Sequence, residues 1–348
     1  MPREKLFGKT LHELQSITEQ MGMPPFAAKQ MADWLYKKQV SGIAAMTNIS
    51  AAKREELQQR YEVGVEAPTE TLTSSDSTKK YLFRIRDKGY IETVLIPDRE
   101  RNTLCVSSQV GCKMNCLFCM TGKQGFSGNL TAGEILNQIR SIPETEEVTN
   151  IVFMGMGEPF DNTGEVLKAL EILTSLYGYA RSPRRITVST IGITPAVTRF
   201  LEHAECHLAI SLHAADEATR KKLMPVEKVY PFKKTVEVLR NYNFSGQRRL
   251  SFEYILFDGL NDSRQCALEL AKQLRGLPCR VNLIKYHAIP CIELRGSPLP
   301  QMVEFRDTLN SKGIISTIRT SKGEDILAAC GMLSTHNSSK REPVQKGD

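Results

Sequence analysis

The spacing of apolar residues changes along the chain and divides it into parts. Between residues 26 and 40, apolar residues recur at helical spacing, at Phe26, Met31, Trp34 and Leu35. Ser50 is a predicted N-cap for a charged helix over residues 51–61, because its hydroxyl can accept an N–H of the first turn. The sequence therefore predicts a small helical N-terminal domain over residues 1–70.

Residues 79–97 have the pattern of strands. Two runs rich in β-branched and aromatic residues, 81–85 and 91–96, flank Asp87, Lys88 and Gly89, which are typical of a tight turn. This pattern predicts a β-hairpin, and we expect residues 71–100 to form an extension or linker built on it.

From residue 104 a strand–helix rhythm repeats. The six predicted strands are Leu104–Gln109, Val148–Met154, Arg185–Thr190, His207–His213, Leu250–Phe257 and Arg280–Tyr286. The predicted helices between them are Thr131–Arg140, Gly164–Leu176, Pro195–His203, Pro231–Tyr242 and Ser263–Arg275. Thr131 and Glu134 have the spacing of a capping box. The alternation predicts an α/β fold with a parallel sheet and right-handed crossovers.

This predicted core covers residues 101–333, and the polar residues 334–348 predict a disordered tail. Repeated βα units fit either an open barrel or a doubly wound sheet, and the pattern alone does not choose between them. In both architectures, ligands gather at the carboxyl ends of the strands.

The composition is typical of a soluble globular protein, with 41% hydrophobic and 24% charged residues among 348. Residues 1–5 are not followed by an apolar run, and no apolar stretch is long enough to span a bilayer, so we expect a cytoplasmic protein. The net charge of +7 is compatible with a nucleic-acid partner but is weak evidence for one. Nine cysteines, an odd number, favour metal-binding or catalytic thiols over a disulfide framework.

Three of these cysteines lie close together, directly after the first predicted strand. Cys112, Cys116 and Cys119 can reach one metal site from a single loop. A structural zinc site would need a fourth ligand, and no second Cys-x-x-Cys pair exists in the sequence. A [4Fe–4S] cluster with three cysteine ligands keeps one iron open, and that iron can bind S-adenosylmethionine (SAM). Spacing and position therefore favour the cluster.

Polar residues and glycines also follow the later predicted strands, where they would face the same ligand. They are Gly157, Glu158, Ser189, Ser211, Leu212 and His213. Each alone is better explained as an ordinary strand end than as a ligand contact. Their recurrence at the same end of consecutive strands suggests one shared binding site.

Together these motifs resemble a known family. The spacing Cys-x-x-x-Cys-x-x-Cys resembles the radical SAM superfamily, and the fuller set resembles its RlmN/Cfr family of RNA methyltransferases. The other motifs of this set are Gln124-Gly125-Phe126, Gly157-Glu158-Pro159, Ser189-Thr190-Ile191-Gly192, Ser211-Leu212-His213 and residues 325–333. The resemblance covers nearly the whole chain and implies a partial (β/α)6 barrel with a small helical N-terminal domain that docks RNA.

The resemblance also implies roles for individual residues. Cys112, Cys116 and Cys119 correspond to the ligands of one [4Fe–4S] cluster. The implied SAM-binding residues are Gly157, Glu158, Ser189, Ser211, Leu212, His213 and His287, the last at a position where relatives usually have Asn. Cys330 corresponds to the cysteine that carries a methyl group, Cys105 to the thiol that forms a transient disulfide with it, and Glu92 to the proton acceptor.

The implied reaction is methylation of carbon 2 of an adenine in the peptidyl transferase centre of 23S rRNA, and of adenine 37 in a subset of tRNAs. Carbon 2 is electron-poor and does not attack the methyl group of SAM directly. The family uses two SAM molecules per turnover, one to methylate the carrier cysteine and one as the source of a 5′-deoxyadenosyl radical. An electron donor such as flavodoxin or ferredoxin is implied, and we expect a monomer with no membrane partner.

Three alternatives stay open. The related Cfr enzymes methylate carbon 8 of the same adenine, although Pro159 and the run Gln124-Gly125-Phe126 lean toward carbon 2. A radical SAM enzyme acting on a small molecule or a protein would have the same cluster but no methyl group on Cys330. A zinc-dependent RNA-binding protein without catalysis would use the basic residues alone.

Overall fold

The computed structural model describes residues 3–290 and 292–334. The predicted tail, apart from Ser334, and Cys291 lie outside the described residues. Within the described part of the chain, no helix is long and apolar enough to cross a membrane.

The N-terminal part is helical, as the sequence predicts. Its elements are β1 (Glu4–Lys5), α1 (Leu11–Gln20), α2 (Ala27–Ala32), the π-helix η1 (Asp33–Lys37), the 3-10 helix η2 (Ile43–Ala45), α3 (Ala51–Arg60) and β2 (Tyr61–Glu62). Ser50 accepts the N–H of Lys53 at 3.4 Å, which confirms the predicted N-cap of α3. Helix α1 begins with a capping box between Thr10 and Glu13 that the sequence analysis did not identify.

The predicted hairpin is part of a three-stranded antiparallel extension. Strands β4 (Lys79–Ile85) and β5 (Gly89–Asp98) pair as predicted, and β3 (Glu70–Thr73) adds a third strand. Strand β5 continues the extension into the main sheet by pairing with β6 (Arg101–Cys105). The extension and the core thus share one sheet of ten strands.

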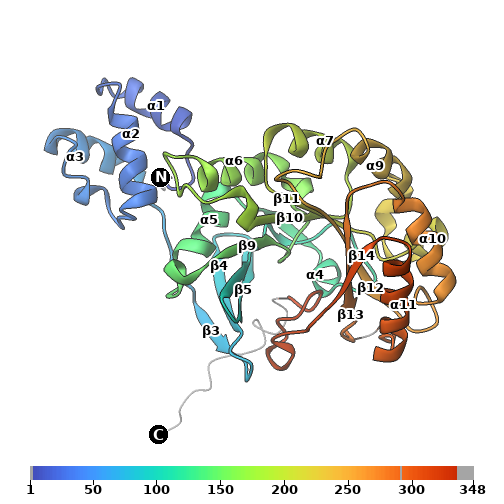
Figure 1. Ribbon diagram of the computed structural model, residues 1–348. Coiled ribbons are helices and arrows are strands. Elements are labelled where there is room, and N and C mark those ends of the chain that lie inside the picture. Colours follow the sequence, from blue (N-terminus) through green and yellow to red (C-terminus); the bar gives the residue numbers. More distant parts are fainter. Residues whose placement is uncertain (1–2, 291, 335–348) are drawn as a thin grey trace, which may run out of the picture.

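The core is an open barrel of parallel strands (Figure 1). Its strands are β6, β9 (Asn150–Phe153), β10 (Ile186–Thr190), β11 (His207–Ser211), β12 (Leu250–Leu256), β13 (Arg280–Lys285) and β14 (Ile315–Arg319). They lie side by side in chain order, and a doubly wound sheet would require that order to reverse. The structure therefore supports the barrel. Because the connections between its parallel strands are right-handed, the helices lie on the outer face of the sheet.

Two details of the predicted core are wrong. The first predicted strand, Leu104–Gln109, ends at Cys105, after which the chain leaves the sheet and forms β7 (Gln109–Gly111), paired with β8 (Phe126–Asn129). A seventh parallel strand, β14, follows the six predicted ones. Its exposed residues alternate with one buried and one intermediate residue, and its β-branched residues Ile315, Thr317 and Ile318 are a strand signal that the sequence analysis missed.

All five predicted core helices are present on the outer face of the sheet (Figure 1). They are α5 (Ala132–Arg140), α6 (Thr163–Thr174), α7 (Thr194–His203), α9 (Phe232–Leu239) and α10 (Arg264–Leu274). The capping box of Thr131 and Glu134 forms as predicted. Unpredicted helices are α4 (Met120–Lys123), α8 (Glu217–Leu223) and α11 (Leu299–Ser311).

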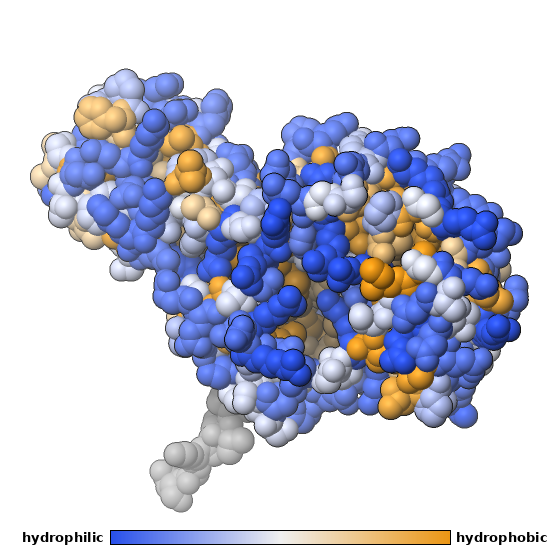
Figure 2. All heavy atoms as spheres, viewed as in Figure 1, coloured by the Kyte–Doolittle hydropathy of each residue, from blue (hydrophilic) through white to orange (hydrophobic). Residues whose placement is uncertain are grey.

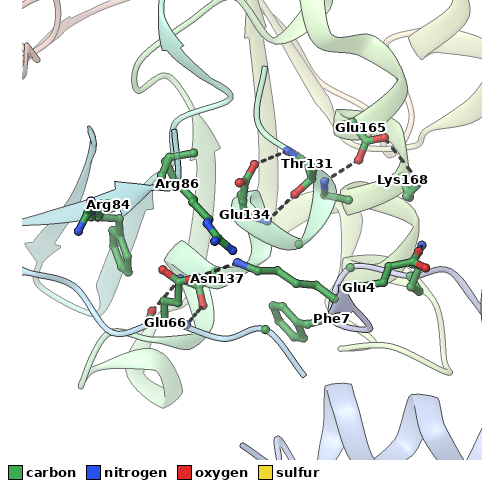
Figure 3. Close-up of a pocket in the computed structure, with 18 residues that line it drawn as sticks. Glu4, Phe7, Glu66, Arg84, Arg86, Thr131, Glu134, Asn137, Glu165 and Lys168 are labelled. Atoms are coloured by element: carbon green, nitrogen blue, oxygen red, sulfur yellow. Dashed lines mark hydrogen bonds and ion pairs between the residues drawn. The ribbon is translucent and has the colours of Figure 1, made fainter. Parts of the chain in front are cut away.

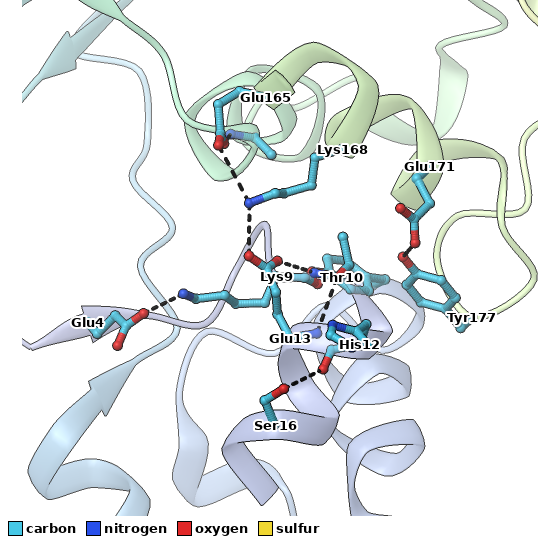
Figure 4. Close-up of polar contacts among 12 residues, drawn as sticks. Glu4, Lys9, Thr10, His12, Glu13, Ser16, Glu165, Lys168, Glu171 and Tyr177 are labelled. Carbon is cyan, nitrogen blue, oxygen red and sulfur yellow. Dashed lines mark hydrogen bonds and ion pairs between the residues drawn. The ribbon is translucent and has the colours of Figure 1, made fainter. Parts of the chain in front are cut away.

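The N-terminal part packs against α5 and α6 at a polar junction. Asn137 exchanges two hydrogen bonds with the backbone of Glu66, at 2.8 and 3.0 Å (Figure 3). Lys168 of α6 bridges to Glu13 of α1 at 2.9 Å (Figure 4). Gly8 lies so close to Gly133 that a Cβ on Gly8 would stand 2.2 Å from the Gly133 nitrogen, so only glycine fits there.

A buried arginine holds together the ends of β10 and β11. Arg220 of α8 is 2% exposed and forms an ion pair with Glu227, which is also buried. Its guanidinium also donates to the carbonyl oxygens of Ile191 (2.7 Å), Ser211 (3.2 Å) and Leu212 (3.1 Å). The planar guanidinium has five N–H donors and can reach all of these acceptors at once. A lysine ammonium has three donors and would leave some of these oxygens unpaired.

We expect Arg220→Met to destabilise the fold by about 3–5 kcal/mol, because it leaves the Glu227 carboxylate buried and unpaired. Lys234→Met is the matched control, since Lys234 and Glu237 form an exposed ion pair, and it should change the free energy of unfolding by less than about 0.5 kcal/mol. Denaturant unfolding of both variants measures this. Equal effects of the two substitutions would contradict the structural role assigned to Arg220.

Candidate functional site

The three clustered cysteines lie on one loop at the carboxyl edge of the barrel. Cys112, Cys116 and Cys119 all line one cavity, which we call the first cavity. The loop is closed at its start by the Cys112 N–H, which donates to the Gly125 carbonyl at 2.7 Å. Gly111 permits this closure, because its φ is +75° and a Cβ there would overlap the Gly125 oxygen. The predicted convergence of the thiols on one cavity is therefore present.

Gly157 and Glu158 form a second wall of the first cavity. Gly157 has a φ of +96° and sits against Gln109, whose side-chain oxygen accepts the Glu158 N–H at 2.8 Å. The carboxylate of Glu158 accepts the N–H groups of Phe160 and Ile191, both at 3.0 Å. Burial raises the pKa of Glu158 to about 7, although these donors oppose the rise. Glu158 thus ties the end of β9 to the end of β10.

The next strand ends complete the first cavity, with one exception among the predicted residues. Ser189, Ser211 and His213 line it, whereas the Leu212 side chain is fully buried in the hydrophobic core. The His213 ring packs edge-on against Phe118 of the cysteine loop, and its Nδ1 accepts the Ile255 N–H at 3.0 Å. Burial lowers the pKa of His213 to about 3, so its imidazole is neutral.

The sequence analysis missed two charged residues of the site, Glu253 and Arg319. Glu253 of β12 is 3% exposed and lines the first cavity. One of its oxygens accepts from Asn282 at 2.8 Å, and the other lies 3.9 Å from Arg319 and has no hydrogen-bond partner among the described residues. A carboxylate within the apolar run of β12 was the signal in the sequence, because buried charges are rare without a function or a partner.

Cys330 lies between two cavities. It lines the first cavity with the three cysteines and also a second cavity, which contains Cys105 and Arg319. Cys330 is exposed, whereas Cys105 is buried at the end of β6. The surrounding protein raises the pKa of both thiols, and the positive charge of Arg319 opposes this rise for each. The structure therefore brings together two thiols that are far apart in sequence.

His287 lines the second cavity and not the first. Its ring is hydrogen-bonded to the Ser321 hydroxyl at 2.9 Å and lies 3.6 Å from Glu324.

Figure 2 shows a hollow on this side of the molecule, rimmed by hydrophilic residues, in the space between β5 and the strands β13 and β14 of Figure 1.

Glu92 lies on the extension and lines a third cavity, next to the Cys330 segment, Leu327–Ser334. Its carboxylate forms an ion pair with Lys80 at 2.9 Å and accepts the N–H of Ser334 at 2.9 Å. Burial raises the pKa of Glu92, and Lys80 and the Ser334 N–H oppose the rise. Lys80 is a further site residue that the sequence analysis missed.

The cysteine loop fits an iron–sulfur cluster better than a single ion. Among the residues that the structure describes, no three His, Cys, Asp or Glu side chains are arranged to hold one metal ion. A tetrahedral zinc site requires such convergence, whereas the three cysteines of a [4Fe–4S] cluster bind three different irons and stand further apart. The first cavity is lined by the three thiols together with backbone, carboxylate and hydroxyl groups.

Two family models match the chain. The model of the radical SAM superfamily matches residues 106–271, and that of the ribosomal RNA large subunit methyltransferase N-terminal domain matches residues 4–63. A protein of Bacteroides thetaiotaomicron named as a probable dual-specificity RNA methyltransferase RlmN is 59% identical over 335 residues, which cover 96% of this chain and 97% of that protein. The dual-specificity RNA methyltransferase RlmN of Desulfotalea psychrophila is 40% identical, with 97% and 98% of the two chains covered.

A solved structure agrees with these matches. The radical SAM methyltransferase from Sphaerobacter thermophilus superposes with a TM-score of 0.88 at 38% identity, and the match covers 96% of this chain and all of the other.

We expect Cys112→Ala, Cys116→Ala and Cys119→Ala each to lose most of the iron and the brown colour of the reconstituted protein, because each removes one of three ligands. Cys206→Ala is the control, since Cys206 is buried in the hydrophobic core away from the loop, and it should keep both. Iron per chain and visible absorption after anaerobic reconstitution measure the effect. Full iron content in all three loop variants, or stoichiometric zinc in the wild-type protein, would exclude the cluster.

Proposed function

Because this chain belongs to the RlmN family of the radical SAM superfamily, we propose that it methylates carbon 2 of adenine in RNA, both in the peptidyl transferase centre of 23S rRNA and at adenine 37 of a subset of tRNAs. The observation that supports this most directly is the position of Cys330, which lines the first cavity and also the second cavity with Cys105. A methyl carrier must reach both the methyl donor and the acceptor base, and this position meets that requirement.

In this proposal, Cys112, Cys116 and Cys119 hold one [4Fe–4S] cluster in the first cavity. When bound, the cluster supplies the electron that cleaves SAM to a 5′-deoxyadenosyl radical. Gly157 lines the space in which SAM would bind, where its missing Cβ makes room for Gln109, and the hydroxyls of Ser189 and Ser211 line the same space. Leu212 and His213 shape this wall, Leu212 from the core and His213 through Phe118.

Cys330 accepts a methyl group from one SAM molecule as a thiolate, by ordinary displacement at carbon. Arg319 favours that thiolate, since its positive charge opposes the rise in the pKa of Cys330 that the surrounding protein causes. Two SAM molecules are therefore used per turnover, one for this methyl group and one for the radical. His287 stays a proposed SAM-binding residue, which would contact SAM from the second cavity, next to Cys330.

Loss of a hydrogen atom from the S-methyl group of Cys330 to the 5′-deoxyadenosyl radical would leave a methylene radical, which bonds to carbon 2 of the bound adenine. The adduct gives up one electron, and Glu92 accepts the proton from carbon 2. Cys105 attacks the sulfur of Cys330 as a thiolate, which breaks the bond between that sulfur and the transferred carbon and leaves a disulfide between the two cysteines, while the released carbon takes up a proton and becomes the methyl group. An external reductant reopens the disulfide, and a protein such as flavodoxin or ferredoxin donates the electron for the cluster. We propose that the enzyme works in the cytoplasm as a monomer.

The RNA would enter the barrel from the end opposite the cysteine loop. Across neighbouring strands, Ser189 pairs with Ala209, Ala209 with Ser251, and Ser251 with Arg280, so these side chains lie on one face of the sheet. Ser189 lines the first cavity, and Arg280 therefore also faces the barrel interior. Arg249 lies two residues before Ser251, the partner of Arg280, and Arg101 lines the second cavity. Burial and the charges of Arg280 and Arg101 lower the pKa of Arg249, as expected for neighbouring cations. Such a cluster attracts the phosphates on either side of an unstacked base.

Nucleoside mass spectrometry of RNA from cells with and without this gene tests the proposed reaction. We expect 2-methyladenosine to disappear from both ribosomal and transfer RNA in the deletion strain and to return when the gene is restored. A Cys330→Ala gene is the matched control and should not restore it. Loss of 8-methyladenosine instead would assign the chain to the Cfr reaction, and unchanged RNA would exclude an RNA substrate.

We expect the double substitution Arg249→Gln, Arg280→Gln to weaken RNA binding and to reduce the slope of log affinity against log salt by about 2, roughly one for each lost phosphate contact. Arg199→Gln with Arg264→Gln removes the same charge from the outer helices α7 and α10 and should leave the slope unchanged. Fluorescence titration of a labelled anticodon stem-loop at several salt concentrations measures both. Equal slopes for the two double variants would contradict the proposed entry path.

A further inference from the structure

Lys80 and Glu92 form an ion pair between neighbouring strands of the extension. Lys80 lies opposite Val94 on β5, and Glu92 is two residues before Val94, so both side chains project from the same face of the sheet. The residues are 8% and 3% exposed, and the Lys80 nitrogen lies 2.9 Å from a Glu92 oxygen. Val94 in turn pairs with Cys105, which places that thiol on the same face.

The Cys330 segment, Leu327–Ser334, covers this face and is held at both ends by the pair. The N–H of Ser334 donates to the second oxygen of Glu92 at 2.9 Å. The ammonium of Lys80 donates to the Leu327 carbonyl at 3.5 Å. Cys330 lies between these two contacts in sequence, so the ion pair spans the ends of the segment that carries the thiol.

The conformation of the segment shows that it needs such support. Leu327 has a φ of +54°, in the left-handed region that a leucine adopts at a conformational cost. The segment is also held by the Met120 N–H, which donates to the Gly331 carbonyl at 2.8 Å, and by the Thr121 hydroxyl, which donates to the Leu333 carbonyl at 2.7 Å. The segment therefore joins the extension to the end of the cysteine loop.

We propose that Lys80 is a positioning residue, which fixes both ends of the Cys330 segment through Glu92 and the Leu327 carbonyl, and that a proton on Glu92 releases this hold. The functional meaning rests on the proposed roles of Glu92 and Cys330. In that reaction Glu92 becomes a neutral acid just before Cys105 must reach the sulfur of Cys330. The release would thus coincide with the step that requires Cys330 to move.

The charges around Glu92 make its ion pair with Lys80 sensitive to the protonation of Glu92. Besides Lys80, the charged groups that face Glu92 in the third cavity are Glu70 of β3 and Asp325. Burial and the negative charge of Glu70 raise the pKa of Glu92, and the positive charge of Lys80 lowers it. Asp325 is held separately, by the Ser74 hydroxyl at 2.6 Å and the Ser75 N–H at 3.1 Å, so it does not replace Glu92 as the partner of Lys80.

Hydrogen exchange of the cluster-reconstituted enzyme without RNA tests this inference. In Lys80→Met and in Glu92→Gln, we expect amides of residues 327–334 to exchange about tenfold faster or more, as for the loss of one charge-assisted contact that limits local opening. Lys80→Arg should stay close to the wild-type rate. Lys79→Met is the matched control, because Lys79 is the adjacent residue, points to the opposite face and pairs with Glu144. It should leave the segment unchanged.

Equal exchange of the segment in Lys80→Met and Lys79→Met, with both variants folded by thermal melting, would overturn the positioning role. Fast exchange in Lys80→Met with wild-type exchange in Glu92→Gln would overturn the release by protonation. The mass of the peptide that contains Cys330 in wild-type protein from cells tests the methyl-carrier role separately. A missing methyl group there would refute the proposed function, while the exchange rates would still decide the role of Lys80.

Discussion

The first cavity depends on the guanidinium of Arg220, buried where two strands of the barrel end. At the carboxyl edge of a parallel sheet the last carbonyl oxygens lose their strand partners, and leaving them unpaired away from water is costly. Arg220 supplies donors to three such oxygens, of Ile191, Ser211 and Leu212, and Glu227 balances its charge. The ends of β10 and β11 are thereby fixed, and Ser211 is held at the cavity wall.

The individual elements and the parallel sheet were predictable from the sequence, whereas particular long-range contacts were not. Helices that begin after a capping residue, such as those after Ser50 and Thr131, formed as predicted because the capping signal lies within one turn. The chain leaves the sheet after Cys105 because distant groups bind it there, among them the Met156 carbonyl, which accepts the Ser108 N–H at 2.9 Å. No local pattern encodes such a contact.

The site divides in the same way. The cysteine loop was predictable because its three thiols lie within one turn-rich segment, and the strand-end residues were predictable because parallel strands end at a common edge. Lys80 and Arg319 were not, since their significance arises from the Cys330 segment and from the pairing of β14. The roles of Cys105 and Cys330 came from the family resemblance, and only the structure brings the two residues to one cavity.

The wall between the first and second cavities is thin, and this bears on how a methyl carrier can work. Both cavities are lined by Met154, Ile284, Cys330 and Leu333. Cys330 therefore borders both cavities from one position in the chain, within a lining that it shares with Met154, Ile284 and Leu333. The segment is anchored through backbone carbonyls and the Ser334 N–H, and none of these anchors uses the Cys330 thiol. The anchors thus fix the backbone of the segment and leave the Cys330 side chain free to rotate. A methyl carrier requires both, because it must be positioned accurately and must still reach the methyl donor and the acceptor base.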